Sequence, residues 1–248
     1  MWRHLRTLGR ELGAGLLHLL YPGSCASCGR SLIVGDKDFC PSCRVALTAD
    51  PYPTCPRCGG TVGPFGLVQG GCSRCRGGHF HFDGVLRLGP YEGLLRELVL
   101  RLKHSTGEGL GESLGHLWAQ HAQVPLRGAG ASVVVPVPLH WWRRWSRGYN
   151  QSEVLAQALA TCLGLPCRPR CLRRIRNTPQ QTRQTPAARR DNVRGAFRAR
   201  HGSTVRGRSI LLVDDVLTTG STCSEAAGAL RQAGAARVTV AVLARSQA

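Results

Sequence analysis

The hydrophobic pattern of the chain from residue 131 onward alternates between short apolar runs and helical stripes. The run ASVVVPVPLH (131–140) is rich in β-branched residues and contains prolines, which predicts a buried strand that leads into a loop. RSILLVDD (208–215) and ARVTVAVLAR (236–245) predict two further strands. Helical patterns lie between the strands, at NQSEVLAQALATCLG (150–164) and SEAAGALRQAGA (224–235). Strands that alternate with helices predict an α/β domain whose sheet is largely parallel.

Apolar residues also recur at helical spacing in three segments nearer the N-terminus. We expect a helix in each segment, and we expect the first helix to pack against the residues that follow it. The apolar positions are Leu5, Leu8, Leu12, Leu16 and Leu19 in the first segment, Leu94, Leu95, Leu98 and Leu102 in the second, and Leu110, Leu114, Leu117 and Trp118 in the third.

The helix predicted over residues 150–164 has signals at both ends. Asn150 and Glu153 have the spacing of a capping box, and Gly164 provides a stop. The segment that follows is different, because residues 168–200 are rich in Arg, Gln and Thr and show little apolar periodicity. We therefore expect a mobile loop over residues 168–200.

The cysteines mark the first third of the chain as a separate unit. Eight of the 12 cysteines lie in four Cys-x-x-Cys pairs, which are Cys25 with Cys28, Cys40 with Cys43, Cys55 with Cys58, and Cys72 with Cys75. Two intervening residues let both sulfurs of a turn face one metal ion, and two such turns complete a tetrahedral four-thiolate site. We therefore expect two zinc sites, in a domain over residues 1–80 that consists of an N-terminal helix and a double zinc ribbon. A second domain would cover residues 81–248.

Spacing alone leaves the pairing of the four cysteine turns open. The first and second turns are separated by 11 residues, the second and third by 11, and the third and fourth by 13, so both sequential and interleaved pairing are allowed. We favour sequential pairing. A disulfide framework would need an oxidising compartment, and an iron–sulfur cluster would use the same thiolates. Zinc is favoured because regular two-residue turns are typical of its structural sites, which organise a domain and leave no open position for catalysis.

The charge of the chain is high and unevenly distributed. The formal net charge is +19, and between His121 and Ile210 there are 17 arginines against two acids, Glu153 and Asp191. A stretch this basic attracts polyanions such as nucleic acids, phosphorylated metabolites or an anionic membrane surface. The alternative is an arginine-rich composition on an ordinary solvated surface.

Neither a membrane span nor a signal peptide is evident in the sequence. No apolar run approaches the ~20 residues that cross a bilayer. The N-terminal segment carries Glu11 and His18 within a short apolar core, and no small-residue cleavage pattern follows. We expect a cytoplasmic protein without a transmembrane segment.

Two adjacent acids, Asp214 and Asp215, end the strand predicted over residues 208–215. The carboxyl ends of parallel strands form the crevice in which α/β proteins bind ligands. Carboxylates suit ribose hydroxyls or a hydrated magnesium ion, and backbone N–H groups at a helix N-terminus favour a phosphate. The acids are followed by a small, hydroxyl-rich turn into a helix, made of Thr218, Thr219, Gly220, Ser221 and Thr222. The segment therefore predicts a sugar-phosphate site.

Other interpretations of this segment are weaker. A phospho-acceptor receiver domain opens on a similar strand, but only 33 residues follow Asp215, too few for its remaining strands. A P-loop is excluded because no Gly-Lys-Ser/Thr follows. A purely structural turn remains as the alternative.

The segment ILLVDDVLTTGST (210–222) resembles the phosphoribosyl-pyrophosphate (PRPP) signature of type I phosphoribosyltransferases. Two more segments, VVVPVPLHWWRRWSRGYNQSEVLAQALA (133–160) and NTPQQTRQTPAARRDNVRGAF (177–197), resemble the ComF (ComFC/GntX-like) family. The resemblance runs from Tyr21 to Arg245. It implies a type I phosphoribosyltransferase-like parallel sheet flanked by helices, preceded by a small double zinc-ribbon domain. The sequence departs from the family in its tryptophans, because the segment is usually simply basic, and this leaves the role of Trp141, Trp142 and Trp145 open.

The resemblance also implies roles for individual residues. Asp214 and Asp215 would hold the ribose hydroxyls of PRPP, the turn from Thr218 to Thr222 would hold its 5′-phosphate, and magnesium would accompany the PRPP. The loop Val137-Pro138-Leu139-His140 would face pyrophosphate, and residues 177–194 would close over the site. Transfer from PRPP passes through an oxocarbenium-like state as pyrophosphate leaves, so cations are needed around it. The candidates are Lys103, Arg147, Arg183 and Arg190.

Three functions are consistent with these features. The first is transfer of phosphoribose to an unidentified nitrogen acceptor, and the second is handling of single-stranded DNA through arginines and stacking tryptophans. The third is a regulatory protein that senses PRPP without chemistry. We expect a ComF-type protein that binds PRPP with magnesium, contacts single-stranded DNA and acts, with other DNA-uptake proteins, in natural transformation or DNA utilisation.

Overall fold

The computed structural model describes residues 23–33, 35–63, 66–68, 71–176, 192–200 and 204–246. The chain divides into two compact units, Met1–Leu47 and Thr48–Ala248. The helix predicted from Leu5 to Leu19 lies outside the described residues, and the predicted domain boundary at residue 80 stays a prediction.

The described part of the first unit contains the first two cysteine turns. An isolated bridge between Ser24 and Ser31 closes the first turn. The second turn opens helix α2 (Pro41–Thr48), which begins directly after Cys40 and carries Cys43 on its buried side.

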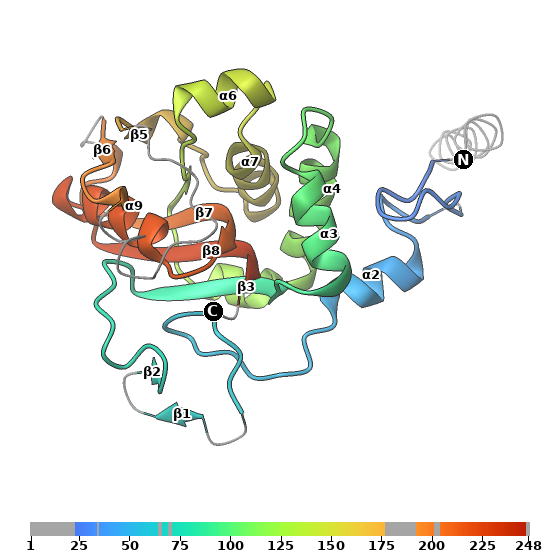
Figure 1. The fold of residues 1–248 in the computed structure, drawn as a ribbon, viewed down its shortest axis with the longest axis horizontal. Helices are drawn as coiled ribbons and strands as arrows, with labels where there is room; N and C mark the ends of the chain where they lie inside the picture. The colour runs from blue at the N-terminus through green and yellow to red at the C-terminus, as the bar shows by residue number, and fades with distance from the viewer. Residues whose placement is uncertain are drawn as a thin grey trace, which may run out of the picture. The chain divides into compact units, whose positions relative to one another are not determined.

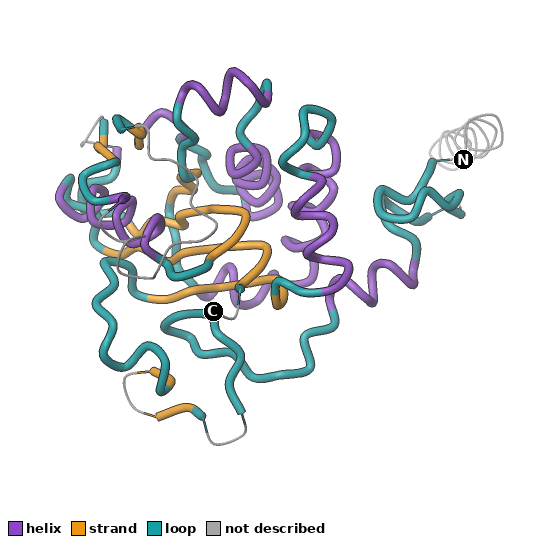
Figure 2. The backbone as a smooth tube through the Cα atoms, viewed as in Figure 1, coloured by secondary structure: helices purple, strands orange, loops and turns teal. Residues whose placement is uncertain are grey.

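A four-stranded parallel sheet forms the centre of the second unit (Figures 1 and 2). Its order is β3 (Gly84–Pro90), β8 (Arg237–Arg245), β7 (Ser209–Leu217) and β4 (Val133–Pro136). All three strand pairs are parallel. Strands β4, β7 and β8 are largely β-branched and aliphatic runs because both faces of the sheet are covered. The predicted parallel α/β fold is confirmed.

Helices cover the two faces of this sheet. Helix α7 (Gln151–Leu163) packs on β4 and β7, and helix α4 (Glu108–His121) packs on α7. Helix α9 (Ser221–Gln232) shares a core cluster with the strand residues Ile210 and Leu212. Successive side chains of a strand point to opposite faces, so α9 and α7 lie on opposite sides of β7. Further helices of the second unit are α3 (Gly93–Arg101), α5 (Gln123–Gly128) and α6 (Trp141–Arg147).

The predicted ends of α7 are confirmed. The side chain of Asn150 accepts a hydrogen bond from the backbone N–H of Ser152 at 3.2 Å, and Gly164 at the C-cap has a φ of 70°. Glycine tolerates this left-handed conformation without a Cβ clash, so it ends the helix.

The expectation of a mobile loop over residues 168–200 is wrong at both ends of that segment. A 3₁₀ turn (Pro169–Cys171) leads into β5 (Leu172–Arg174), which pairs antiparallel with β6 (Phe197–Ala199). The sparse apolar residues Leu172 and Phe197 are buried in the same core cluster as α9, so a few well-placed side chains are enough to order the two strands. Residues 177–191 lie outside the described part of the chain.

Further elements were not predicted, namely strand β3, helices α2, α5 and α6, and a short hairpin of β1 (Leu67–Val68) and β2 (Gly71–Cys72). Within the described residues, no helix is long and apolar enough to cross a membrane.

Candidate functional site

The acidic pair lies near the carboxyl end of β7, inside the strand. Asp214 is 9 % exposed and Asp215 is 7 % exposed. Their backbone is fixed by pairing with β8, where Asp214 lies opposite Val242. Buried carboxylates need partners, because an unpaired charge in a low-dielectric interior is strongly unfavourable.

Asp214 receives hydrogen bonds but carries a strongly raised pKa. Its Oδ1 accepts from Ser152 Oγ at 2.8 Å and from the backbone N–H of Asp215 at 3.0 Å, and its Oδ2 accepts from Cys223 Sγ at 3.7 Å. Burial and then the neighbouring charge of Asp215 raise the pKa of Asp214 to about 7, against the hydrogen bonds, which lower it. Burial and the charge of Asp214 also raise the pKa of the Cys223 thiol. Asp214 therefore gains or loses a proton easily near neutral pH.

Asp215 is joined to two predicted cationic residues. Lys103 Nζ lies 3.9 Å from Asp215 Oδ2, and Gln151 Nε2 donates to the same oxygen at 3.4 Å. Arg147 Nη1 donates to Gln151 Oε1 at 2.9 Å, so the amide of Gln151 links the guanidinium to the carboxylate. Lys103 follows α3 and is held there by a hydrogen bond from Tyr149 Oη to the carbonyl of Leu102. The structure thus brings Lys103 and Arg147 to the acidic pair.

The hydroxyl-rich turn connects β7 to α9. Gly220 is the N-cap of α9 and has a φ of 82°, a left-handed conformation suited to glycine. Thr219 Oγ1 and Ser221 Oγ are 2.8 Å apart, and the backbone N–H of Ser221 donates to Thr219 Oγ1 at 3.4 Å. The remaining hydroxyls of the turn belong to Thr218, which is exposed, and Thr222, which is half-buried. The turn thus places hydroxyls beside the N–H groups of the first turn of α9, where the helix dipole favours an anion.

The loop after β4 lies beside the acidic strand. The backbone N–H of Val137 donates to the carbonyl of Val213 at 2.8 Å, and the carbonyl of Val137 accepts from Asn150 Nδ2 at 3.2 Å. Pro138 is half-buried, and the loop ends at His140, which is 7 % exposed. His140 Nδ1 has no hydrogen-bond partner among the described residues. Burial, Arg174 and Arg143 lower the pKa of His140, so its ring is neutral near pH 7.

Both four-cysteine clusters are assembled, and their pairing is sequential. The ligand atoms of Cys25, Cys28, Cys40 and Cys43 lie within 4.8 Å of one another, and so do those of Cys55, Cys58, Cys72 and Cys75. Four sulfurs around a tetrahedral zinc with Zn–S bonds of about 2.3 Å lie about 3.8 Å apart. The Sγ atoms of Cys28 and Cys40 are 3.8 Å apart, and those of Cys58 and Cys72 are 3.7 Å apart. Each cluster fits one structural zinc ion, and none of the 12 cysteines, all of which are described, forms a disulfide.

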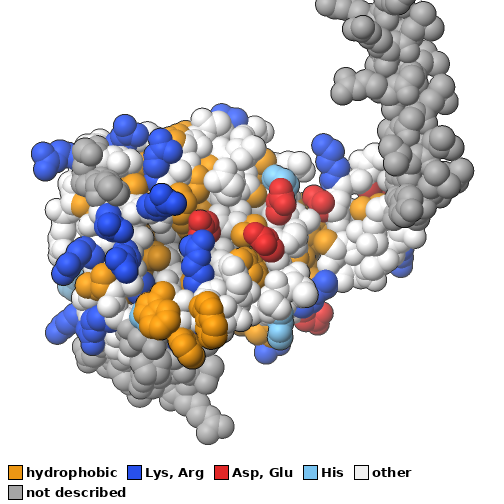
Figure 3. All heavy atoms as spheres, turned by 90° about the horizontal axis from the view of Figure 1, so that it is seen from above, with side chains coloured by type: hydrophobic (Ala, Val, Ile, Leu, Met, Phe, Trp, Pro, Cys, Tyr) orange, Lys and Arg blue, Asp and Glu red, His pale blue; other side chains and the backbone are white. Residues whose placement is uncertain are grey.

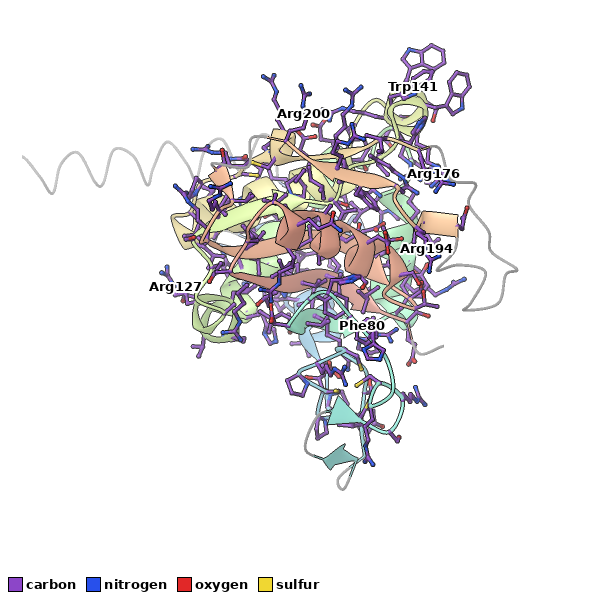
Figure 4. All side chains as sticks on the ribbon, turned by 90° about the vertical axis from the view of Figure 1, so that its left-hand side faces the viewer. Phe80, Arg127, Trp141, Arg176, Arg194 and Arg200 are labelled. Carbon is purple, nitrogen blue, oxygen red and sulfur yellow. The ribbon has the colours of Figure 1, made fainter. Side chains whose placement is uncertain are left out.

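The tryptophans of α6 are exposed. Trp141, Trp142 and Trp145 have 65 %, 52 % and 74 % of their surfaces accessible, and neighbouring rings contact one another at centroid distances of 5.7 and 5.5 Å. Large hydrophobic side chains lie beside a group of Lys and Arg side chains on the face shown in Figure 3. Trp141 and Arg200 both project from the upper edge of the molecule in Figure 4. The exposed arginines of β5, β6 and their flanks include Arg173, Arg176, Arg194, Arg198 and Arg200.

Several residues of this site were missed by sequence reasoning, and two predicted residues lie outside the described part. Ser152, Gln151 and Cys223 contact the acids, although no short motif marks them. Their only signal is position, since Gln151 and Ser152 open the helix that follows the β4 loop. Arg183 and Arg190 fall within residues 177–191 and are outside the described residues.

Comparison with known proteins agrees with this architecture. A phosphoribosyl transferase domain model matches residues 150–248, and a double zinc ribbon domain model matches residues 16–77. The protein is thus a double zinc ribbon joined to a phosphoribosyltransferase-type α/β domain. A DNA utilization protein of Salmonella typhi is 33% identical over 231 residues, which are 92% of this chain and 99% of that protein.

Two further relatives are competence proteins. Competence protein F of Haemophilus influenzae is 29% identical over 90% of this chain and 96% of its own length. Competence protein ComFC of Bacillus subtilis is 27% identical over 83% of this chain and 82% of its own length. The chain belongs to the ComF family.

Proposed function

We propose that this protein binds PRPP together with magnesium at the carboxyl end of β7 and transfers phosphoribose to a nitrogen acceptor. The observation that carries the proposal is the buried pair Asp214 and Asp215 directly before a hydroxyl-lined turn at the N-terminus of α9. The carboxylates would accept hydrogen bonds from the ribose hydroxyls, and the turn from Thr218 to Thr222 would hold the 5′-phosphate. Magnesium, when bound, would neutralise charge on the departing pyrophosphate.

The surrounding residues suit the pyrophosphate end of the ligand. Lys103, just after α3, approaches Asp215 directly, and Arg147 of α6 is linked to it through Gln151; both would contact phosphate oxygens as cations. Val137, Pro138 and the buried ring of His140 would line the pyrophosphate. We also propose that Arg183 and Arg190 complete the set of cations over the leaving group.

Calorimetry with PRPP and magnesium tests the site. Replacing both Asp214 and Asp215 by alanine should abolish binding. The control is Glu108→Ala with Glu112→Ala, which removes the same charge from exposed positions of α4 and should leave the affinity unchanged. Equal affinity of the wild type and the Asp214/Asp215 variant would exclude this site. Pyrophosphate release in the presence of candidate nitrogen acceptors separates transfer from sensing of PRPP.

We also propose that the surface of α6 binds single-stranded DNA, and that the protein acts in DNA uptake or DNA utilisation as the names of its relatives suggest. The specific support is the row of three exposed tryptophans among arginines, because bases stack on aromatic rings while cations follow the phosphates. Alanine substitution of a stacking aromatic weakens binding by about 1–3 kcal/mol per base.

Fluorescence anisotropy with a labelled oligothymidylate tests this second proposal. Trp142→Ala with Trp145→Ala should weaken binding, and Tyr52→Ala, at another exposed aromatic residue, should not. Wild-type affinity should fall steeply with salt. Undetectable binding at low salt would remove DNA as a direct ligand.

A further inference from the structure

The second cysteine cluster lies beside the hydroxyl-rich turn, within the same compact unit. A cavity of about 410 Å³ is lined by Cys58, Gly60 and Cys75 of the ribbon and by Thr218, Thr219 and Ser221 of the turn. The first cluster belongs to the other unit. The second cysteine cluster, unlike the first, therefore belongs to the same compact unit as the hydroxyl-rich turn.

Arg245 connects the second cluster to the start of the turn. This last residue of β8 donates from Nε to the carbonyl of Cys58 at 2.9 Å and from Nη1 to the carbonyl of Leu217 at 3.2 Å. The same Nη1 also donates to the carbonyl of Thr218. One guanidinium thus holds a metal-ligand residue and the first residue of the turn, and its rigid fork makes both contacts at once.

A second connection, through Phe80, reaches Gly220 in the middle of the turn. Arg57 donates from Nη1 to the carbonyl of Cys75 at 3.0 Å, and its guanidinium lies 6.0 Å from the ring centre of Phe80. Phe80 packs against Gly220, because a Cβ built on Gly220 would lie 3.2 Å from Phe80 Cε1. Figure 4 shows the labelled Phe80 between the loops of the second cysteine cluster and the α/β domain.

The ribbon itself is fixed to the edge of the sheet. Arg87 of β3 forms a bidentate ion pair with Asp50 and donates to the carbonyl of Gly59 at 2.9 Å, with its side chain only 2 % exposed. The backbone N–H of Val85 donates to the carbonyl of Pro56 at 2.9 Å. A shift of the cysteine turns on loss of metal would therefore be transmitted to the sheet and the turn.

We propose that zinc in the cluster of Cys55, Cys58, Cys72 and Cys75 and a phosphate ligand at the turn Thr218–Thr222 bind cooperatively, with Arg245 as the positioning residue between them. Metal binding to a zinc ribbon supplies folding free energy, so it sets the positions of the carbonyls of Cys58 and Cys75. These carbonyls orient Arg245, which holds the start of the turn, and Arg57, which contacts the Phe80 ring that packs against Gly220. The coupling is reciprocal, so phosphate binding would also retain this zinc. This inference rests on the proposed phosphate site.

Hydrogen exchange measures the effect of the second zinc on the turn without any phosphate ligand. Loss of the second zinc through Cys75→Ser should raise amide exchange of residues 217–222 about tenfold, the scale of a typical coupling. The matched control is Cys43→Ser, the last thiol of the first cluster, which should leave exchange of this turn unchanged. Equal exchange in the two variants would overturn the coupling, whether or not PRPP binds.

Arg245 variants keep the inference testable if Cys75→Ser fails to fold. Arg245→Met should retain two zinc ions, yet ribose 5-phosphate should no longer slow zinc release to a chromogenic chelator, as it should about tenfold in the wild type. Arg245→Lys keeps the charge but cannot make the forked contact, so it should also lose the effect. Retention of the full effect in Arg245→Met would refute the role of Arg245. Binding of PRPP that is indifferent to all these changes would remove the coupling and leave the proposed function standing.

Discussion

The raised pKa of Asp214 predicts that neutralising this residue stabilises the protein at alkaline pH. The folded state holds a proton on Asp214 that the unfolded chain releases, because burial and Asp215 raise the pKa of Asp214 from 3.8 to about 7. Stability is therefore lost as the pH rises from about 4 to about 7, and the loss is complete above the folded pKa. At pH 8 the burial of this charge costs about 4 kcal/mol of unfolding free energy.

Asp214→Asn removes the charge and keeps the shape of the side chain. Its Oδ1 can still accept from Ser152 Oγ, and its amide replaces the oxygen beside Cys223. We expect a gain of about 2–4 kcal/mol at pH 8 that shrinks to about 1 kcal/mol near pH 4.5. Urea unfolding monitored by circular dichroism at both pH values measures the difference, in magnesium-free buffer without a chelator so that zinc is retained.

Two variants control this experiment. Asp83→Asn affects a partly exposed carboxylate paired with Arg231, so the stability should change by no more than about 1 kcal/mol. Ser152→Ala removes a donor to the Asp214 carboxylate and should lower stability at pH 8 more than at pH 4.5. An Asp214→Asn protein no more stable than the wild type at pH 8, or one whose difference from the wild type is independent of pH, would refute the reasoning.

Three other outcomes are expected. Gly115→Ala should destabilise the folded protein by about 1–3 kcal/mol, because the new Cβ would lie 2.6 Å from Ala158 Cβ between α4 and α7. Gly109→Ala, where a Cβ meets no atom within 4 Å, should stabilise the protein by about 0.4–1 kcal/mol. Thermal unfolding of the two variants measures both effects. Elemental analysis should give about two zinc ions per chain, and substantial iron would overturn the assignment of the clusters. The affinity for PRPP with magnesium should rise between about pH 6 and pH 8, since ligand binding favours the ionised form of Asp214. Calorimetry at several pH values measures this affinity, and an affinity independent of pH would contradict the prediction.

The strands and helices that carry the acidic turn were predictable because their signals are local. The runs that became β4, β7 and β8 are uninterrupted and β-branched, and Asn150 and Gly164 mark the ends of α7. Strand β3 was not predictable in this way. Its sequence GVLRLGP includes two glycines, a proline and Arg87, whose charge is satisfied by Asp50 from a distant part of the chain.

The acids of the candidate site were visible in the sequence, but their partners were not. Ser152 reaches Asp214 because β4 pairs with β7 in a register that sets Pro136 opposite Val213, which places the start of α7 beside the acids. Cys223 reaches Asp214 because α9 turns back immediately after Gly220. Both contacts depend on tertiary geometry, which residue spacing does not encode.

The energetics of the acidic pair suggest why the second zinc ribbon is built into the same unit. Two adjacent buried carboxylates destabilise the folded state. A strand end that carries such a pair needs rigid support from outside the sheet. Arg245 and Arg57 supply that support by joining the carbonyls of Cys58 and Cys75 to the turn region. A zinc tetrathiolate carries a net negative charge of about two, so these arginines also compensate the metal cluster. The same two guanidiniums thus link the zinc site to the proposed phosphate site, so loss of either ligand should weaken binding of the other.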